Sequence, residues 1–329
     1  MDPQEEAELC FPQLINTSCK KPMQHRSETT FIYILFSCIS LVTVSLNLMV
    51  IISISHFRQL HTPTNHLLLS LAVSDFLVGF LLMPVRIRLM GNCWLWGSFM
   101  CALFRYTSFI ITSSSVGNVI LISIDRYVAI NDPLSYPTKV TQKRVQFCVC
   151  LCWACCVIYN GAILSDFLKR PQTFYSCYGE CGNVLTYVSG VVDVIITFIF
   201  PITLIIVLYM RVFVVAVTQA RAMRSQIAAV SVQGSVGLAA MKSERKAAKT
   251  LGVVVVVFLM CFCPYFYPSL VTQETSTTFS AFGLWLLYCN SCFNPLIYAY
   301  FYPWFRKSIK LIVTLQILHR DSCDANVLQ

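Results

Sequence analysis

Charged residues are scarce in this chain of 329 residues: 12% are Asp, Glu, Lys or Arg, whereas 57% are of apolar types. Charged side chains make up about a quarter of an ordinary soluble domain. The deficit therefore argues against a soluble globular protein. The formal net charge of +9 is spread over short segments and forms no basic block. We therefore expect no nucleic-acid partner.

Histidine is also rare. The five copies are His25, His56, His61, His66 and His319. They are scattered over the tails, a loop and the ends of apolar runs, so the sequence brings no base, nucleophile or metal ligands together. We predict that the chain is not an enzyme and has no catalytic cofactor. Internal repeats and paired interrupted helices, which are typical of transporters, are missing as well.

A cleaved secretory leader is not evident either, because residues 1–28 are polar and acidic. The first apolar run is then expected to act as an uncleaved signal. Most of the 17 cysteines lie within apolar runs. A thiol there is a small apolar filler, so the cysteine count alone does not predict a disulfide scaffold.

Long apolar runs, in contrast, are abundant. Seven of them occur, at about 30–56, 65–90, 98–130, 144–166, 185–215, 247–271 and 279–302. A helix of about 20 apolar residues crosses a bilayer, so we predict an all-α membrane protein with a seven-transmembrane helix bundle. Residues 1–29 would form an extracellular tail and residues 30–302 the bundle. Residues 303–329 would form a short amphipathic helix on the inner leaflet and a cytoplasmic tail.

Orientation follows from the distribution of Lys and Arg. The segments after the first, third and fifth runs and after the seventh carry more of these residues than the segments on the other side. The positive-inside rule then places the N-terminus outside a multi-pass protein, for which we expect the plasma membrane. The sequon Asn16-Thr17-Ser18 agrees, and predicts glycosylation of Asn16.

The third run is the centre of the predicted bundle. Its polar residues recur at spacings of four and three and share one face of a helix: Cys101, Arg105, Ser108, Thr112 and Ser115. Polar groups find no partner in hydrocarbon, so this face must contact protein or water. We therefore expect this helix to be surrounded by other helices.

Motifs along the chain resemble those of class A (rhodopsin-like) G-protein-coupled receptors. They are Asn47, Leu71-Ala-Val-Ser-Asp75, Cys101, Asp125-Arg126-Tyr127, Trp153, Pro201, Tyr209 and Asn294-Pro295-Leu-Ile-Tyr298. The stretch Asn290–Phe305 further resembles the seventh-helix fingerprint of the trace amine-associated receptors. The resemblance is to a divergent, fish-type member. It implies an olfactory receptor for small amines in the cell membrane, coupled to a heterotrimeric G protein and raising cAMP.

Three positions depart from that family's pattern. Leu46 stands where glycine is usual, and Phe262 stands in place of a tryptophan. Ser108 occupies the third-helix position where amine receptors carry the aspartate that binds ammonium.

Asp193 is the candidate replacement for that missing aspartate, because it lies alone in the apolar run Val191–Ile196. An intramembrane acid is costly and usually marks a site or a partner. Divergent family members resemble this chain in carrying a fifth-helix aspartate, so we expect Asp193 to bind the ligand's ammonium group. The alternatives are an ion pair with Arg86, Arg88 or Arg105, or a neutral aspartate.

Other residues are expected to complete the ligand site. Aromatic rings attract cations, and four of them occur in the outer halves of the sixth and seventh runs: Phe262, Tyr265, Phe266 and Tyr288. Ser108 and Thr112 would offer hydroxyl groups to the far end of the ligand. Each aromatic taken singly also fits ordinary core packing.

A second intramembrane acid, Asp75, is expected to join Ser115, Asn290, Ser291 and Asn294. In related receptors such residues hold a sodium ion, and oxygen ligands suit a hard cation. A hydrated network without an ion is the alternative. Near the cytoplasmic side, Asp125, Arg126 and Tyr127 are expected to couple the receptor to its G protein, or to form a static ion pair.

The resemblance also implies disulfide bonds on the outer side. Cys101 is expected to pair with Cys181 and not with Cys177. Cys177 would then pair with Cys19 or Cys10, tying the tail to the loop.

The ligand itself has an open alternative. Arg86, Arg88 and Arg105 lie near the outer mouth and could bind an anionic or zwitterionic ligand. A receptor with high basal activity is a further alternative, given Phe262.

Overall fold

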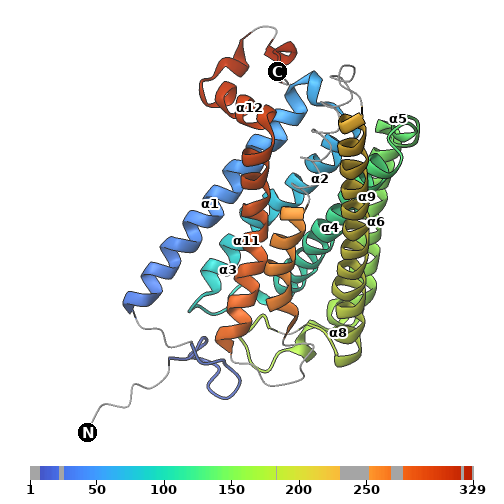
Figure 1. Cartoon of the computed structure of the whole chain (residues 1–329). Helices are drawn as coiled ribbons and strands as arrows, with labels where there is room; N and C mark the ends of the chain where they lie inside the picture. The colour runs from blue at the N-terminus through green and yellow to red at the C-terminus, as the bar shows by residue number, and fades with distance from the viewer. Residues whose placement is uncertain are drawn as a thin grey trace.

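The computed structural model describes residues 8–21, 26–182, 184–229, 252–267, 277–319 and 322–327. Helices dominate this part of the chain, and strand pairing there is limited to two isolated bridges, Leu9 with Lys20 and Ser18 with Tyr178. Figure 1 shows the long helices side by side in one bundle. The main helical segments of the chain are α1 (Arg26–His56), α2 (Pro63–Leu77), α3 (Met83–Leu89), α4 (Gly97–Asn131), α6 (Gln142–Ile163), α8 (Tyr187–Val194), α9 (Phe200–Ala229), Gly252–Tyr267, α11 (Thr277–Phe301) and α12 (Pro303–Val313).

Among the described residues, five helical stretches are long and apolar enough to cross a membrane. They are Thr30–His56, Pro63–Leu89, Gly97–Asn131, Gln142–Ile163 and Tyr187–Val215, and they fall on the first five predicted runs. Of the sixth run, the structure describes the shorter apolar helix Gly252–Tyr267, and the rest lies outside the described residues. The seventh run is α11, which is less hydrophobic because it contains the polar residues Asn290, Ser291 and Asn294.

Helix α4 occupies the centre of the bundle, as its polar face predicts. It packs against α2, α6 and α9. Its inward residues Ser114, Ser115 and Asn118 are buried. The outer surface has the opposite character, since Phe147 and Ile158 on α6 are 68% and 72% exposed. Apolar side chains on the outside and polar ones within are the pattern expected of a protein in lipid.

Two helices contain a π-helical turn that ends shortly before a proline. Residues Val78–Leu82 (η2) precede Pro84, and residues Ile195–Ile199 (η4) precede Pro201. Proline lacks an N–H group and clashes with the carbonyl four residues earlier. In each turn the hydrogen bond skips to the fifth residue back, from Met83 to Val78 and from Phe200 to Ile195. The extra residue rotates the outer part of each helix relative to the inner part.

Disulfide bonds fix the end of the bundle that the predicted orientation places outside the cell, here called the outer end. The described residues form Cys101–Cys181, Cys19–Cys177 and Cys10–Cys93. The first pair is the expected one, and Cys177 has Cys19 as its partner rather than Cys10. The bond to Cys93 was not anticipated. Cys19–Cys177 holds residues 8–21 against the loop before α8, where Cys19 N–H also donates to the Tyr178 carbonyl at 2.9 Å. Cys10–Cys93 ties the same residues to the segment before α4.

At the opposite end, α12 begins at Pro303 and has the predicted amphipathic character. It buries Trp304, Phe305 and Ser308, and packs against α1 and α11. Residues 322–327 then fold back onto the turn after α1. Asp324 pairs with Arg58 at 3.2 Å and Val327 is fully buried. Figure 1 shows α12 at the end opposite to α8.

Candidate ligand site

A cavity lies within the outer half of the bundle, between α3, α4, α8, Gly252–Tyr267 and α11. Its free space is about 550 Å³, counting the part open to solvent. All seven residues proposed from the sequence line it: Asp193, Ser108, Thr112, Phe262, Tyr265, Phe266 and Tyr288. The structure therefore brings the candidate ligand residues together.

Asp193 is the acidic residue of the cavity wall and is 7% exposed. The Tyr159 hydroxyl donates to its Oδ1 at 3.1 Å, and the Thr197 hydroxyl donates to its backbone carbonyl at 2.7 Å. The ion pairs of the described residues involve Glu8, Asp125, Asp132 and Asp324, and not Asp193. Within this part of the chain, the carboxylate accepts from the Tyr159 hydroxyl and forms no ion pair.

The three arginines that compete for Asp193 in the sequence have other neighbours. Arg105 Nη2 donates to the carbonyls of Cys181 at 2.7 Å and Gly182 at 2.5 Å, so it supports the disulfide-bonded loop. The Arg86 guanidinium lies 5.5 Å from the ring centre of Phe104. Arg88 lies 5.9 Å from the ring centre of Trp96 and lines a separate outer cavity. Arg86 and Arg105 line the same cavity as Asp193.

Aromatic rings form the wall contributed by the sixth helix. Phe262 and Phe266 are buried, and Phe266 stacks on Phe198 with ring centres 4.4 Å apart. Tyr265 meets Phe266 edge-on at 5.0 Å. This packing keeps the rings in place, and faces that remain towards the cavity can contact a cation.

The hydroxyl residues of α4 are placed as expected, with one difference. Ser108 donates to the Phe104 carbonyl of its own helix at 2.7 Å, so in this conformation its oxygen can accept a hydrogen bond from a ligand. The sequence analysis did not identify Tyr159, which donates to Asp193 from α6. A single tyrosine in an apolar run carries no pattern that distinguishes it from a packing residue.

The Asp75 cluster links α2, α4 and α11. Asp75 is fully buried and accepts from Ser291 at 2.8 Å, Asn294 at 2.8 Å and Ser115 at 3.5 Å. Asn290 is not bonded to it, and its Oδ1 is buried without a hydrogen-bond partner in the described residues. The oxygen-rich donor set and this orphaned acceptor fit a sodium ion with water. The sodium site stays a prediction, because Asp75 is already satisfied by three side-chain donors.

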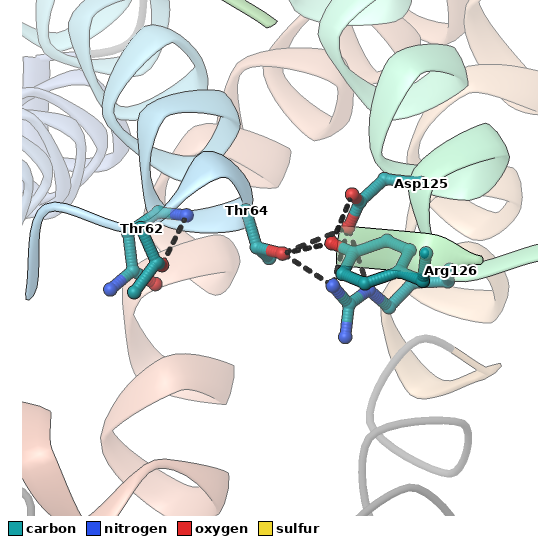
Figure 2. A network of polar contacts seen from close by, with 6 residues as sticks. Thr62, Thr64, Asp125 and Arg126 are labelled. Carbon is teal, nitrogen blue, oxygen red and sulfur yellow. Dashed lines mark hydrogen bonds and ion pairs between the residues drawn. The ribbon is translucent and has the colours of Figure 1, made fainter. Parts of the chain in front are cut away.

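A second polar network joins the cytoplasmic ends of α2 and α4 (Figure 2). Asp125 pairs with Arg126, whose Nε lies 2.9 Å from Oδ2. The Thr64 hydroxyl donates to the same oxygen at 3.0 Å and also accepts from Arg126 Nη2. Tyr136, in the short helix α5 (Tyr136–Lys139), donates to Asp125 Oδ1 at 2.7 Å. Burial raises the pKa of the Tyr136 phenol, so it remains a donor.

Tyr127 is not part of this network. It packs instead against Ile130 and Val212, which are buried between α4 and α9. Asp125 and Arg126 are thus held in one polar cluster, whereas the third residue of the triplet has an apolar role at the helix–helix contact.

Thr64→Val tests whether the network restrains the receptor that the motif resemblance implies. Valine keeps the shape of threonine and removes the hydroxyl that bridges Asp125 and Arg126. A hydrogen bond contributes about 0.5–1.5 kcal/mol, so we expect ligand-independent signalling to rise about two- to tenfold. The matched control is Thr62→Val, because Thr62 caps α2 through Asn65 N–H at 3.3 Å and does not touch Asp125 (Figure 2). Equal effects of the two variants would contradict a restraining role for Thr64.

Comparisons with known proteins agree with this architecture. The model of the family "7 transmembrane receptor (rhodopsin family)" matches residues 46–298. Trace amine-associated receptor 13c of Danio rerio is 39% identical, over 98% of this chain and 97% of that protein. Trace amine-associated receptor 6 of Pan troglodytes is 38% identical, over 97% and 95%. Trace amine-associated receptor 1 of Macaca mulatta is 36% identical, over 94% and 95%.

These matches confirm the seven-transmembrane bundle and the multi-pass membrane location expected from the apolar runs, and they confirm that the chain is a receptor and not an enzyme. The chain belongs to the rhodopsin family of seven-transmembrane receptors and, within it, to the trace amine-associated receptors.

Proposed function

We propose that this receptor detects small amines in the plasma membrane of olfactory neurons, with the ligand's ammonium group bound by Asp193. Binding activates a heterotrimeric G protein and raises cAMP. The names of the relatives support amines as ligands. The observation that carries the assignment to Asp193 is its buried carboxylate in the cavity wall, without an ion-pair partner among the described residues.

The energetics favour a charged ligand at this point. Placing an aspartate in the centre of a membrane helix costs about 2.5–3.5 kcal/mol. Tyr159 supplies a hydrogen bond to the carboxylate, which has no ion-pair partner among the described residues. An ammonium group would supply the missing opposite charge in a desolvated site, where one member of such a pair is worth about 2–5 kcal/mol.

Ser108 occupies the α4 position at which other amine receptors carry the aspartate that binds ammonium. It has no charge, so the ammonium group is expected at Asp193 on α8 and not on α4. Ser108 lines the cavity as a neutral residue whose proton is already donated to Phe104. The amine would therefore lie reversed across the cavity relative to receptors with a third-helix aspartate. The aromatic wall of Phe262, Tyr265 and Phe266 would face its apolar part and add cation–π contact near its charged end.

Signal transmission requires a ligand that prefers the active state. Phe262 lines the cavity and stacks on Phe258 with ring centres 4.0 Å apart. A ligand that displaces Phe262 would move the helix Gly252–Tyr267. This movement would in turn break the ion pair between Asp125 and Arg126 at the cytoplasmic end. Arg126 would then be free to meet the G protein.

A counter-screen tests the proposal. Cells that express the receptor and a cAMP reporter are exposed to straight-chain amines and to alcohols and carboxylic acids of the same length. We expect the amines to raise cAMP, because Asp193 requires a positive charge, and the alcohols to be inactive. A response to alcohols at the potency of the amines, or a high signal that no compound changes, would contradict the proposal.

A further inference from the structure

We propose that the preferred ligands are zwitterions, specifically ω-amino carboxylates, with the ammonium group on Asp193 and the carboxylate on Arg86 and Arg105. This inference rests on the proposed function, because it places the amine at Asp193. It adds a second, anionic subsite to the same cavity.

The first observation is the charge of the cavity wall. Asp193 contributes one negative charge, whereas Arg86 and Arg105 contribute two positive charges. The formal balance of these three groups is thus +1. A simple monoamine would add another positive charge to this wall. A ligand with one ammonium and one carboxylate would satisfy both ends of the cavity and add no net charge.

The second observation is that both guanidinium groups keep unused donors. The Nε atoms of Arg86 and Arg105 are buried and have no hydrogen-bond partner in the described part of the chain. The ion pairs formed there involve neither residue. Arg86 and Arg105 also lie close enough to interact unfavourably with each other. A buried, unpaired donor on a charged group is costly, and a carboxylate accepts from guanidinium forks with good geometry.

The two subsites are separated across the cavity. Arg86 belongs to α3, whereas Asp193 belongs to α8, and Figure 1 shows these helices apart at the outer end of the bundle. Tyr265 lines the same cavity as the three charged residues Arg86, Arg105 and Asp193. This separation favours an ω-amino acid with a carbon spacer over an α-amino acid, whose two charges share one carbon. The aromatic wall would contact the spacer.

Arg86 is the informative residue to change. Arg105 also holds the loop carbonyls of Cys181 and Gly182, so its replacement would disturb the disulfide-bonded loop. Arg86 lies over the Phe104 ring and forms no ion pair with the described residues. Arg88 offers a matched control, since it is an arginine of the same helix that lines the separate outer cavity.

The experiment compares ε-aminocaproic acid, hexylamine and hexanoic acid on wild type, Arg86→Gln, Arg88→Gln and Asp193→Asn, with surface expression measured for each. On wild type, we expect ε-aminocaproic acid to be at least about tenfold more potent than hexylamine. Arg86→Gln should remove this advantage, measured as the ratio of the potencies of ε-aminocaproic acid and hexylamine on the same variant. Arg88→Gln should behave as wild type. If Arg86→Gln does not reach the surface, Arg86→Lys should reduce the advantage by losing the guanidinium fork.

Different outcomes separate this inference from the proposed function. If Asp193→Asn weakens hexylamine while the amino acid has no advantage on wild type, the anionic subsite is wrong and the amine site stands. If Asp193→Asn leaves hexylamine unchanged, both proposals fail. Activation by hexanoic acid at the potency of ε-aminocaproic acid would also overturn the zwitterion, because the ammonium group would then contribute nothing.

Discussion

Asp193→Asn is expected to lower the potency of amine agonists by about a hundredfold or more. The substitution keeps the size of the side chain and the acceptor for the Tyr159 hydroxyl, but removes the negative charge. Loss of one member of a desolvated charge pair costs about 2–5 kcal/mol, and each 1.4 kcal/mol is about a tenfold change in affinity. The measurement is the dose response of cAMP to a straight-chain amine, normalised to surface expression.

Two further variants serve as controls for the loss of charge. Tyr159→Phe removes the hydroxyl that donates to Asp193 at 3.1 Å and leaves the carboxylate in place. It should therefore change potency much less than Asp193→Asn. Ser108→Asp in the Asp193→Asn background returns a carboxylate to the opposite wall of the cavity, and should restore part of the response. An unchanged dose response in Asp193→Asn would remove Asp193 from the ligand site.

Asp125→Asn is expected to raise ligand-independent signalling about tenfold or more. Asp125 is buried and accepts hydrogen bonds from Arg126, Thr64 and Tyr136, which belong to three different helices. Hydrogen bonds to a charged group are worth about 1.5–3 kcal/mol each. Removing the charge destabilises the resting state, in which Arg126 is paired with Asp125. It has little effect on the stability of an active state in which this pair is already broken. An active population of a few per cent would thereby become substantial.

The same assay can separate release of Arg126 from general damage. Asp132 also accepts from a basic side chain, Lys139, at 2.6 Å, but it is more exposed and lies outside the network. Asp132→Asn should leave basal cAMP unchanged. A fall in basal signalling in Asp125→Asn, at normal surface expression and with Asp132→Asn unaffected, would show that Asp125 does not restrain the resting state.

The helical architecture follows closely from the sequence because it depends on local and additive signals. Apolar runs long enough to span a bilayer define the helices. The polar stripe on residues 101–115 predicts the central position of α4, which the packing confirms. The alternation of apolar and basic residues after Pro303 likewise predicts the amphipathic helix α12.

Details that depend on distant contacts could not be predicted. The bond Cys10–Cys93 joins residues 83 positions apart, and no spacing rule distinguishes Cys93 from other candidates. The π-helical turn before Pro201 changes the face on which Asp193 lies, although proline alone predicts only a kink. The hydrogen bond from Tyr159 to Asp193 joins two helices that are separate in the sequence, α6 and α8. In the site itself, residue types and the family resemblance predicted seven members of the cavity wall, whereas other members, such as Thr197, and the hydrogen-bond partners required coordinates.

The most direct test of the central claim is a cryo-electron microscopy structure of the receptor bound to a potent straight-chain amine and its G protein. We predict that the ammonium nitrogen lies about 2.7–2.9 Å from a carboxylate oxygen of Asp193, the length of a charge-assisted hydrogen bond. An ammonium group bound elsewhere in the cavity, with Asp193 bonded to Tyr159 or to an arginine, would contradict the account.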